Sequence, residues 1–125
     1  MKKQISISKT GKYSQIGKSS KKINNVWIVL HGYGMLSEYF VKKFECIIDE
    51  TTLVIAPEAT NRFYLANNYT RVGASWMTKL DREQEISDNI LFLDKLFSIN
   101  FKLPFNSPTK RAILFALDGL REMFL

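Results

Sequence analysis

The chain has 125 residues, of which 46% are hydrophobic, and a formal net charge of +6 at pH 7. This length suits one domain over residues 1–125, and the longest apolar runs fall far short of the ~20 residues that a membrane-spanning helix needs. The single cysteine, Cys46, excludes an internal disulfide, and no apolar segment follows the basic N-terminus as in a signal peptide, so we expect a cytoplasmic protein. Because Cys46 lies among apolar residues, we expect a buried thiol.

The positive charge is concentrated near the N-terminus. Residues 1–37 contain seven lysines and no acidic residue. Such a cluster could attract nucleic acid or an anionic surface. However, no arginine is among these lysines, and only Tyr13 is able to stack on a base. The pattern therefore favours a solvated face, and no nucleic-acid partner is expected.

The first predicted element is a β-hairpin. Polar and apolar residues alternate over residues 4–8 and again over residues 13–17, and a Thr-Gly pair between them suits a turn. Five consecutive apolar residues then predict a buried strand over residues 26–31, which runs into a loop that contains two glycines.

Helices and strands alternate after that loop. Apolar residues recur at helical spacing over residues 37–47, with Ser37 as the expected N-cap. A short apolar strand over residues 53–56 then stops at Pro57. A strand, a helix and a strand without a hairpin-sized connection form a βαβ unit, so these two strands are expected to be parallel.

The second half of the chain begins with residues 57–80, which show little periodicity and are predicted as a long loop. A helix is predicted over residues 81–97, because acidic residues begin it and one apolar stripe runs along it. The stripe consists of Ile86, Ile90, Leu93, Leu96 and Phe97. A third buried strand is predicted over residues 112–117.

These elements predict an α/β fold, in which an N-terminal antiparallel hairpin leads into a doubly wound, mainly parallel sheet. Ligands bind to such sheets beyond the carboxyl ends of the strands. That rim is expected to hold the residues that follow each strand, which are 31–34, 57–58 and 118–119.

The loop after the first buried strand reads His31-Gly32-Tyr33-Gly34. Glycines let the backbone turn with no Cβ in the way, so the Tyr33 N–H is able to point into a cavity and bond a developing oxyanion. The alternatives are an ordinary glycine-rich turn and a structural, hydrogen-bonded His31. Because the chain has no second histidine and no second cysteine, we expect no metal site.

Five blocks of sequence within about residues 4–114 form a pattern in their combination and order. The blocks are His31-Gly32-Tyr33-Gly34, Glu38-Tyr39-Phe40 with Lys43-Phe44-Glu45, Val54-Ile55-Ala56-Pro57-Glu58, Arg62-Phe63-Tyr64-Leu65 and Arg71-Val72-Gly73-Ala74-Ser75-Trp76-Met77-Thr78. Together they resemble α/β-hydrolase esterases of the phospholipase/carboxylesterase type, which are related to acyl-protein thioesterases. The resemblance implies an α/β-hydrolase fold, hydrolysis of a small-molecule ester or acyl substrate, and no cofactor.

The resemblance makes the Tyr33 N–H one oxyanion-hole donor, within an oxyanion loop formed by His31, Gly32 and Gly34. It also implies that the segment Ser75-Trp76-Met77 lies near the acyl-binding mouth.

In that segment Trp76 and Met77 are the expected substrate-binding residues. Trp76 also suits an aromatic anchor that fastens a long loop onto the sheet. Arg62 and Arg71 suit either an anionic substrate or a structural tie, to Glu58 or to backbone carbonyls.

The chain departs from this family at the nucleophile. The family's next strand leads into Gly-x-Ser-x-Gly, and an acid and a histidine follow later. The corresponding segment, residues 114–120, has no serine and lacks the first glycine. Asp118 as a nucleophile would still need a histidine base from a later loop. No catalytic residue is therefore assigned.

We accordingly expect the N-terminal portion of a carboxylesterase- or phospholipase-like serine hydrolase, with a truncated α/β-hydrolase fold and no activity as it stands. The alternative is a non-catalytic binding module that holds an acyl or anionic ligand with residues 31–34 and 57–80. A truncated sheet has an uncovered edge, so self-association is also expected.

Overall fold

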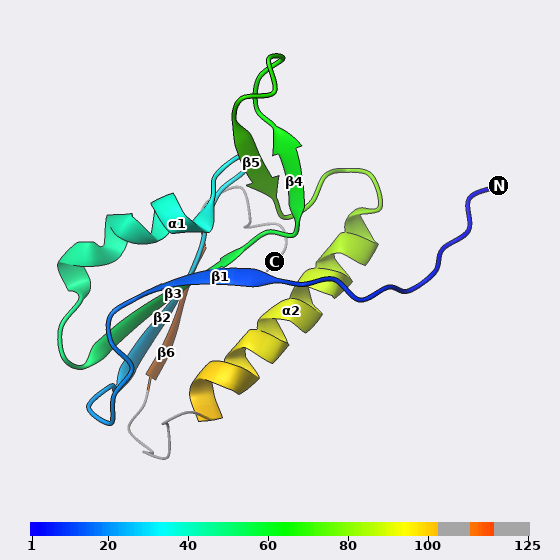
Figure 1. The fold of residues 1–125 in the computed structure, drawn as a ribbon. Helices are drawn as coiled ribbons and strands as arrows, with labels where there is room; N and C mark the ends of the chain where they lie inside the picture. The colour runs from blue at the N-terminus through cyan, green and yellow to red at the C-terminus, as the bar shows by residue number, and fades with distance from the viewer. Residues whose placement is uncertain (103–110, 117–125) are drawn as a thin grey trace.

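A four-stranded sheet forms the centre of the computed structural model, which describes residues 1–102 and 111–116 (Figure 1). Along the sheet the strands lie in the order β1-β3-β2-β6, and β2 pairs in parallel with both β3 and β6. Only β1 runs antiparallel, against β3, so the sheet is mainly parallel, as expected. The strands are β1 (Lys12–Ile16), β2 (Asn25–Leu30), β3 (Thr52–Glu58) and β6 (Arg111–Ala116).

Helices pack on both faces of this sheet. The short helix α1 (Ser37–Phe40) and the 3-10 helix η1 (Val41–Ile47) follow β2, and the long helix α2 (Arg82–Lys102) follows later in the chain (Figure 1). None of the helices in the described residues is both long enough and apolar enough to cross a membrane.

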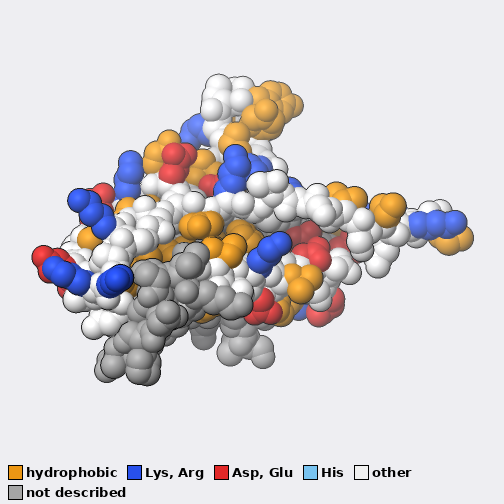
Figure 2. Space-filling model, turned by 60° about the horizontal axis from the view of Figure 1, so that its bottom comes forward, with side chains coloured by type: hydrophobic (Ala, Val, Ile, Leu, Met, Phe, Trp, Pro, Cys, Tyr) orange, Lys and Arg blue, Asp and Glu red, His pale blue; other side chains and the backbone are white. Residues whose placement is uncertain are grey.

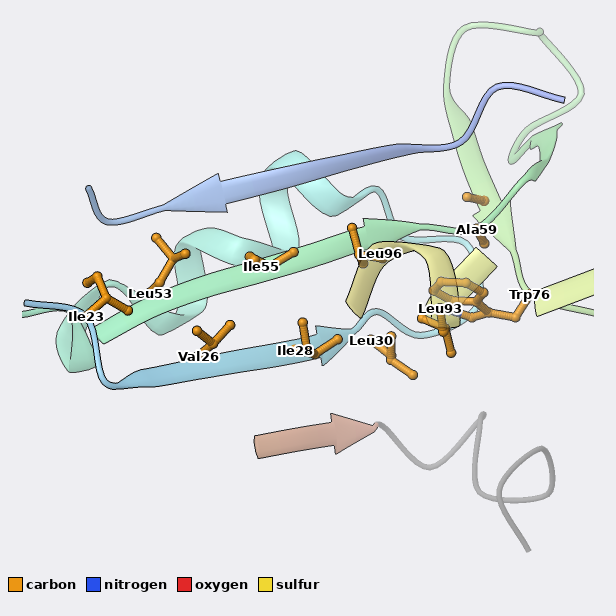
Figure 3. Close-up of a cluster of buried hydrophobic side chains, with 11 residues drawn as sticks. Ile23, Val26, Ile28, Leu30, Leu53, Ile55, Ala59, Trp76, Leu93 and Leu96 are labelled. Carbon is orange, nitrogen blue, oxygen red and sulfur yellow. The ribbon is translucent and has the colours of Figure 1, made fainter. Parts of the chain in front are cut away.

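Two hydrophobic clusters separate the helices from the sheet. Ile28 and Leu30 of β2 belong to the cluster that also contains Leu93 and Leu96 of α2 (Figure 3). Val29, between them in the sequence, belongs to the cluster on the other face with α1 and η1. Successive strand residues point to opposite faces, so a strand with no polar side requires cover on both. The continuous apolar run of β2 therefore accounts for a doubly wound arrangement.

The predicted N-terminal hairpin is wrong. Residues 4–8 form no strand, and β1 pairs instead with β3, where Tyr13 lies opposite Pro57 and Ile16 opposite Val54. Alternation identifies a half-buried strand but does not identify its partner. The predicted end of the next strand at Pro57 is also wrong. β3 continues to Glu58, because β1 pairs with it as far as that residue.

Residues 1–11 form no helix or strand, and the start of this segment projects from the body of the molecule (Figures 1 and 2). Its side chains are exposed, including Ile5 at 87% and Ile7 at 80%. The seven lysines of residues 1–37 are also exposed. The basic part of the chain is thus solvated, as the sequence indicates.

The helix predicted over residues 37–47 exists, but only its first turn is α-helical. Ser37 is not the N-cap: Leu36 occupies that position and forms no side-chain cap hydrogen bond. Ser37 is the first helical residue, and its hydroxyl turns inward to Ser14 and Glu58. A partner distant in the sequence has therefore replaced local capping.

The 3-10 geometry of η1 also explains why the expected burial of Cys46 is wrong. A 3-10 helix repeats every three residues, so Val41, Phe44 and Ile47 pack toward the sheet. Cys46 lies between two of these positions and is exposed.

The loop predicted over residues 57–80 is wrong, because it contains a second, two-stranded sheet. β4 (Asn61–Tyr64) pairs antiparallel with β5 (Val72–Ser75), and their connection projects from the molecule (Figure 1). Both strands are four residues long, and β5 consists of small residues apart from its first. Short strands of this composition leave little periodicity in the sequence.

The helix predicted over residues 81–97 is confirmed as α2, but one residue of its stripe is misplaced. Ile90 is 45% exposed, whereas Asn89 is 2% exposed and faces inward. The Asn89 Nδ2 donates to the Trp76 carbonyl at 2.8 Å, which explains a buried amide at this position.

The third predicted strand is confirmed as β6 up to Ala116; Leu117 and the predicted rim residues 118–119 lie outside the described residues. Among the strands that are described, β6 forms one edge of the sheet. The expected self-association at this edge stays a prediction.

Candidate functional site

The loop that follows β2 is a tight turn at the carboxyl end of the sheet. The Met35 N–H donates to the Gly32 carbonyl at 3.2 Å, and Gly34 has a φ of +78°. A positive φ at the third position of such a turn defines type II, which requires glycine or asparagine there. The second glycine of His31-Gly32-Tyr33-Gly34 is thus a requirement of the turn.

This turn is fastened to β5. The Gly34 N–H donates to the Ala74 carbonyl at 2.9 Å, and the Ala74 N–H donates to the Met35 carbonyl at 3.1 Å. The approach is so close that a Cβ on Gly73 would lie 2.4 Å from the Gly34 carbonyl oxygen. Gly73 is therefore required by the packing of two backbones, and the β4–β5 hairpin holds the turn in place.

The Tyr33 N–H lies at the top of this turn. Within residues 1–102 and 111–116 it donates to no acceptor, whereas the N–H groups on either side, of Gly32 and Gly34, are both engaged. The Tyr33 side chain is 68% exposed and its ring lies against Phe63, with centroids 4.9 Å apart. The backbone of Tyr33 thus offers a hydrogen-bond donor to a ligand.

His31 is completely buried, and both of its ring nitrogens are engaged. The Ala59 N–H donates to Nε2 at 3.0 Å, so Nδ1 carries the proton and donates to the Gly32 carbonyl at 2.8 Å. Burial lowers the pKa of His31 below its ordinary 6.5, and the Gly32 hydrogen bond and the charge of Glu58 only partly offset this effect. His31 is a neutral group whose ring has no nitrogen left to act as a base.

Trp76 joins this end of β2 to the segment after β5. It is 3% exposed, and its Nε1–H donates to the His31 carbonyl at 2.9 Å (Figure 3 shows its ring among the core residues). Met77 is partly buried against the same core, and its carbonyl accepts a hydrogen bond from the Ser75 hydroxyl at 3.0 Å. Trp76 is thus an anchor for its segment, and a substrate-binding role for Trp76 or Met77 stays a prediction.

Glu58, at the end of β3, forms an ion pair with Arg62 and accepts a hydrogen bond from the first residue of α1. Its Oε2 accepts from Arg62 at 2.7 Å, and its Oε1 accepts from the Ser37 N–H at 3.2 Å. Burial raises the pKa of Glu58, but the hydrogen bonds from Arg62 and Ser37 outweigh it and lower the pKa below its ordinary value. Of the two roles that Arg62 suits, the structural tie to Glu58 is the one observed.

A groove of about 540 Å³ opens between α1–η1 and the β4–β5 hairpin. Two of its lining residues are cationic, Lys43 from η1 and Arg71 from the segment before β5, and none is acidic. The sequence pattern singles out Arg71 but not the groove, because its walls are about 30 residues apart along the chain. The lining residues are Gly34, Met35, Leu36, Tyr39, Phe40, Lys43, Leu65, Thr70, Arg71 and Val72.

No protein-family model matches this chain, and no curated protein is similar to it. In the described residues, no three His, Cys, Asp or Glu side chains form a group that could hold a metal ion.

Proposed function

We propose that the chain is the N-terminal portion of a carboxylesterase- or phospholipase-like serine hydrolase, and that these 125 residues alone hydrolyse no ester. The observation that carries the proposal is the Tyr33 N–H, which has no acceptor among the described residues and lies in a glycine turn at the carboxyl end of a buried parallel strand. A fixed N–H in this position is what stabilises the oxyanion of an acyl-transfer reaction.

The absence of activity follows from the single histidine of the chain. A serine nucleophile of this class needs a histidine base within hydrogen-bond reach. The ring nitrogens of His31 are bonded to Gly32 and Ala59, and residues 114–120 include no serine. The buried hydroxyl groups of Ser37 and Ser75 also have partners within the fold.

Two measurements test this proposal. The 125-residue chain is incubated with a fluorophosphonate probe and with p-nitrophenyl butyrate, and we expect neither serine labelling nor hydrolysis above background. A frameshift or a premature stop near residues 114–117 would account for the missing nucleophile motif, so translation of the DNA from codon 110 onward in all three frames is expected to reveal Gly-x-Ser-x-Gly followed by acid and histidine motifs. Covalent labelling of a serine would contradict the inactivity, and the lack of such motifs in every frame would contradict the hydrolase origin.

The groove favours a second candidate function, a non-catalytic binding module. The groove lies beside Gly34 and is lined mainly by apolar side chains together with two cationic ones. Ligand sites commonly combine an apolar lining with a few polar or charged groups in this way. Saturable ligand binding by a chain that shows no ester turnover, and whose DNA has no nucleophile motif in any frame, would favour this candidate.

A further inference from the structure

The groove between α1–η1 and the hairpin has an apolar floor that is open to solvent. Its size, about 540 Å³, falls in the range of small-molecule sites, roughly 300–1,000 Å³. Leu65 is 40% exposed and Val72 38% exposed on the hairpin side, and Tyr39 is 63% exposed on the helix side. Apolar surface of this kind favours a ligand that covers it, because covering it releases water.

The two cations of the groove come from its opposite walls. The Lys43 ammonium lies over the ring of Phe40, 5.7 Å from its centroid, which places the charge above the apolar floor. Arg71 belongs to the hairpin wall, and its backbone is fixed because its carbonyl accepts the Leu65 N–H at 2.8 Å. The Lys43 side chain and the Arg71 backbone thus both have contacts within the fold.

In the described part of the chain, neither Lys43 nor Arg71 forms an ion pair, and no acidic residue lines the groove. Arg62 provides the contrast, because Glu58 compensates its charge at 2.7 Å. An uncompensated pair of cations beside apolar surface attracts an anion, and the planar guanidinium suits a carboxylate or a phosphate.

We propose that this groove binds a single-chain amphiphilic anion. Lys43 and Arg71 engage its carboxylate or phosphate monoester headgroup, and the alkyl chain lies along Leu36, Leu65 and Val72. The charge of the pair and the exposed apolar floor select this ligand class over neutral lipids and over small inorganic anions. The proposal does not depend on ester hydrolysis, so the labelling and translation experiments above leave it unaffected.

Binding is measured by isothermal titration calorimetry with four ten-carbon probes at low ionic strength. These are decanoate, decyl phosphate, 1-decanol and decyltrimethylammonium, and inorganic phosphate is added as a headgroup without a chain. We expect saturable binding of decanoate or decyl phosphate, at least tenfold tighter than of the neutral, cationic and chainless probes. Comparison of the two anions identifies which headgroup is preferred.

Two variants assign the binding to the groove. Lys43→Met and Arg71→Met keep an apolar stem and remove the charge, and each is expected to weaken anion binding about tenfold, equivalent to about 1.4 kcal/mol. Lys79→Met, an exposed lysine outside the groove, is the matched control and is expected to change affinity less than twofold. Circular dichroism verifies that each variant is folded.

The wild-type chain alone also tests the proposal, through salt. Raising the ionic strength screens the two cations and should weaken anion binding while leaving any decanol binding unchanged. The proposal is overturned if neither anion binds, if decanol binds as tightly as the anions, or if both methionine variants retain the wild-type affinity.

Discussion

The Trp76 indole N–H donates to the backbone carbonyl of His31 at 2.9 Å, while the two rings stack with their centroids 5.1 Å apart. This pair joins the end of β2 to the segment after β5, 45 residues away. The imidazole is in turn bonded to Ala59 and Gly32. One buried aromatic pair thus connects three segments around the glycine turn.

The hydrogen bond of this pair should be measurable through Trp76→Phe. The substitution keeps an aromatic ring but leaves the buried His31 carbonyl without its donor, so we expect the free energy of unfolding to fall by about 1–3 kcal/mol. Urea denaturation measures the loss. Trp27→Phe, at a half-buried tryptophan, is the matched control and should cost less. Equal losses for the two variants would contradict this role of Trp76.

The buried, neutral His31 predicts a stability that depends on pH. Because its pKa is lowered in the folded state, the unfolded chain binds the proton more readily. The free energy of unfolding should therefore be constant above the ordinary pKa of 6.5 and fall as the pH drops below it, at up to about 1.4 kcal/mol per pH unit.

Urea denaturation between pH 7.5 and pH 5.5 measures this dependence. Since His31 is the only histidine of the chain, His31→Gln should remove the slope over this range, whatever its effect on overall stability. A variant with the wild-type slope would assign the titration to another group.

Gly73→Ala tests the close approach of the turn and the hairpin. The new Cβ would lie 2.4 Å from the Gly34 carbonyl oxygen, a backbone atom that moves only if the hairpin shifts, so we expect a loss of about 2–3 kcal/mol. Hydrogen exchange of the Gly34 and Ala74 amides should also accelerate.

Gly11→Ala is the control for that substitution. Its Cβ would also meet a close neighbour, but this neighbour is the ring of Phe92, at 2.8 Å, and a half-buried side chain is able to turn aside. A smaller loss is expected than at Gly73. If both variants lose the same stability, the backbone contact is not the cause.

Glu58→Gln tests the charge that compensates Arg62 and the Ser37 N–H. We expect a loss of about 1–2 kcal/mol at pH 7, because charged hydrogen bonds are replaced by neutral ones. The pKa of Glu58 is lowered in the folded state, so its contribution is present above the ordinary 4.5 and is lost as the pH falls below that value.

The stability curves of wild type and Glu58→Gln should therefore converge in acid. Glu83→Gln serves as control, because the side chain of Glu83 is 87% exposed in its ion pair with Arg82 and an exposed pair contributes little. Curves that stay parallel below pH 4.5 would refute the role of Glu58.

Some elements were predictable because their signals are local. The apolar run of β2 and the stripe of α2 indicate burial through periodicity alone, and the structure confirms both except at Ile90. The glycine turn was predictable as a turn, since two glycines follow an apolar run. The structure confirms it, because Gly34 has the positive φ that a type II turn needs. Periodicity did not reveal β4 and β5, which are too short and too small in their side chains to produce it.

The site was less predictable, because its contacts join residues far apart in the sequence. Nothing near Ser37 indicates that its N–H bonds Glu58, and nothing near Lys43 indicates that it shares a groove with Arg71. Cys46 was misplaced for a related reason: its neighbours are apolar, but the 3-10 winding of η1 decides which of them face the sheet.

The local pattern of residues was enough to predict that β2 and β3 are buried and that the chain turns after β2, because an apolar run and a glycine pair are signals carried by a few neighbouring residues. The folded structure alone reveals that β1 pairs with β3, that His31 is enclosed by Ala59 and Trp76, and that two cations line one groove. Those outcomes depend on which distant segments pack together. The free energy of that packing arises from contacts between two segments, so the sequence of either segment alone does not reveal it.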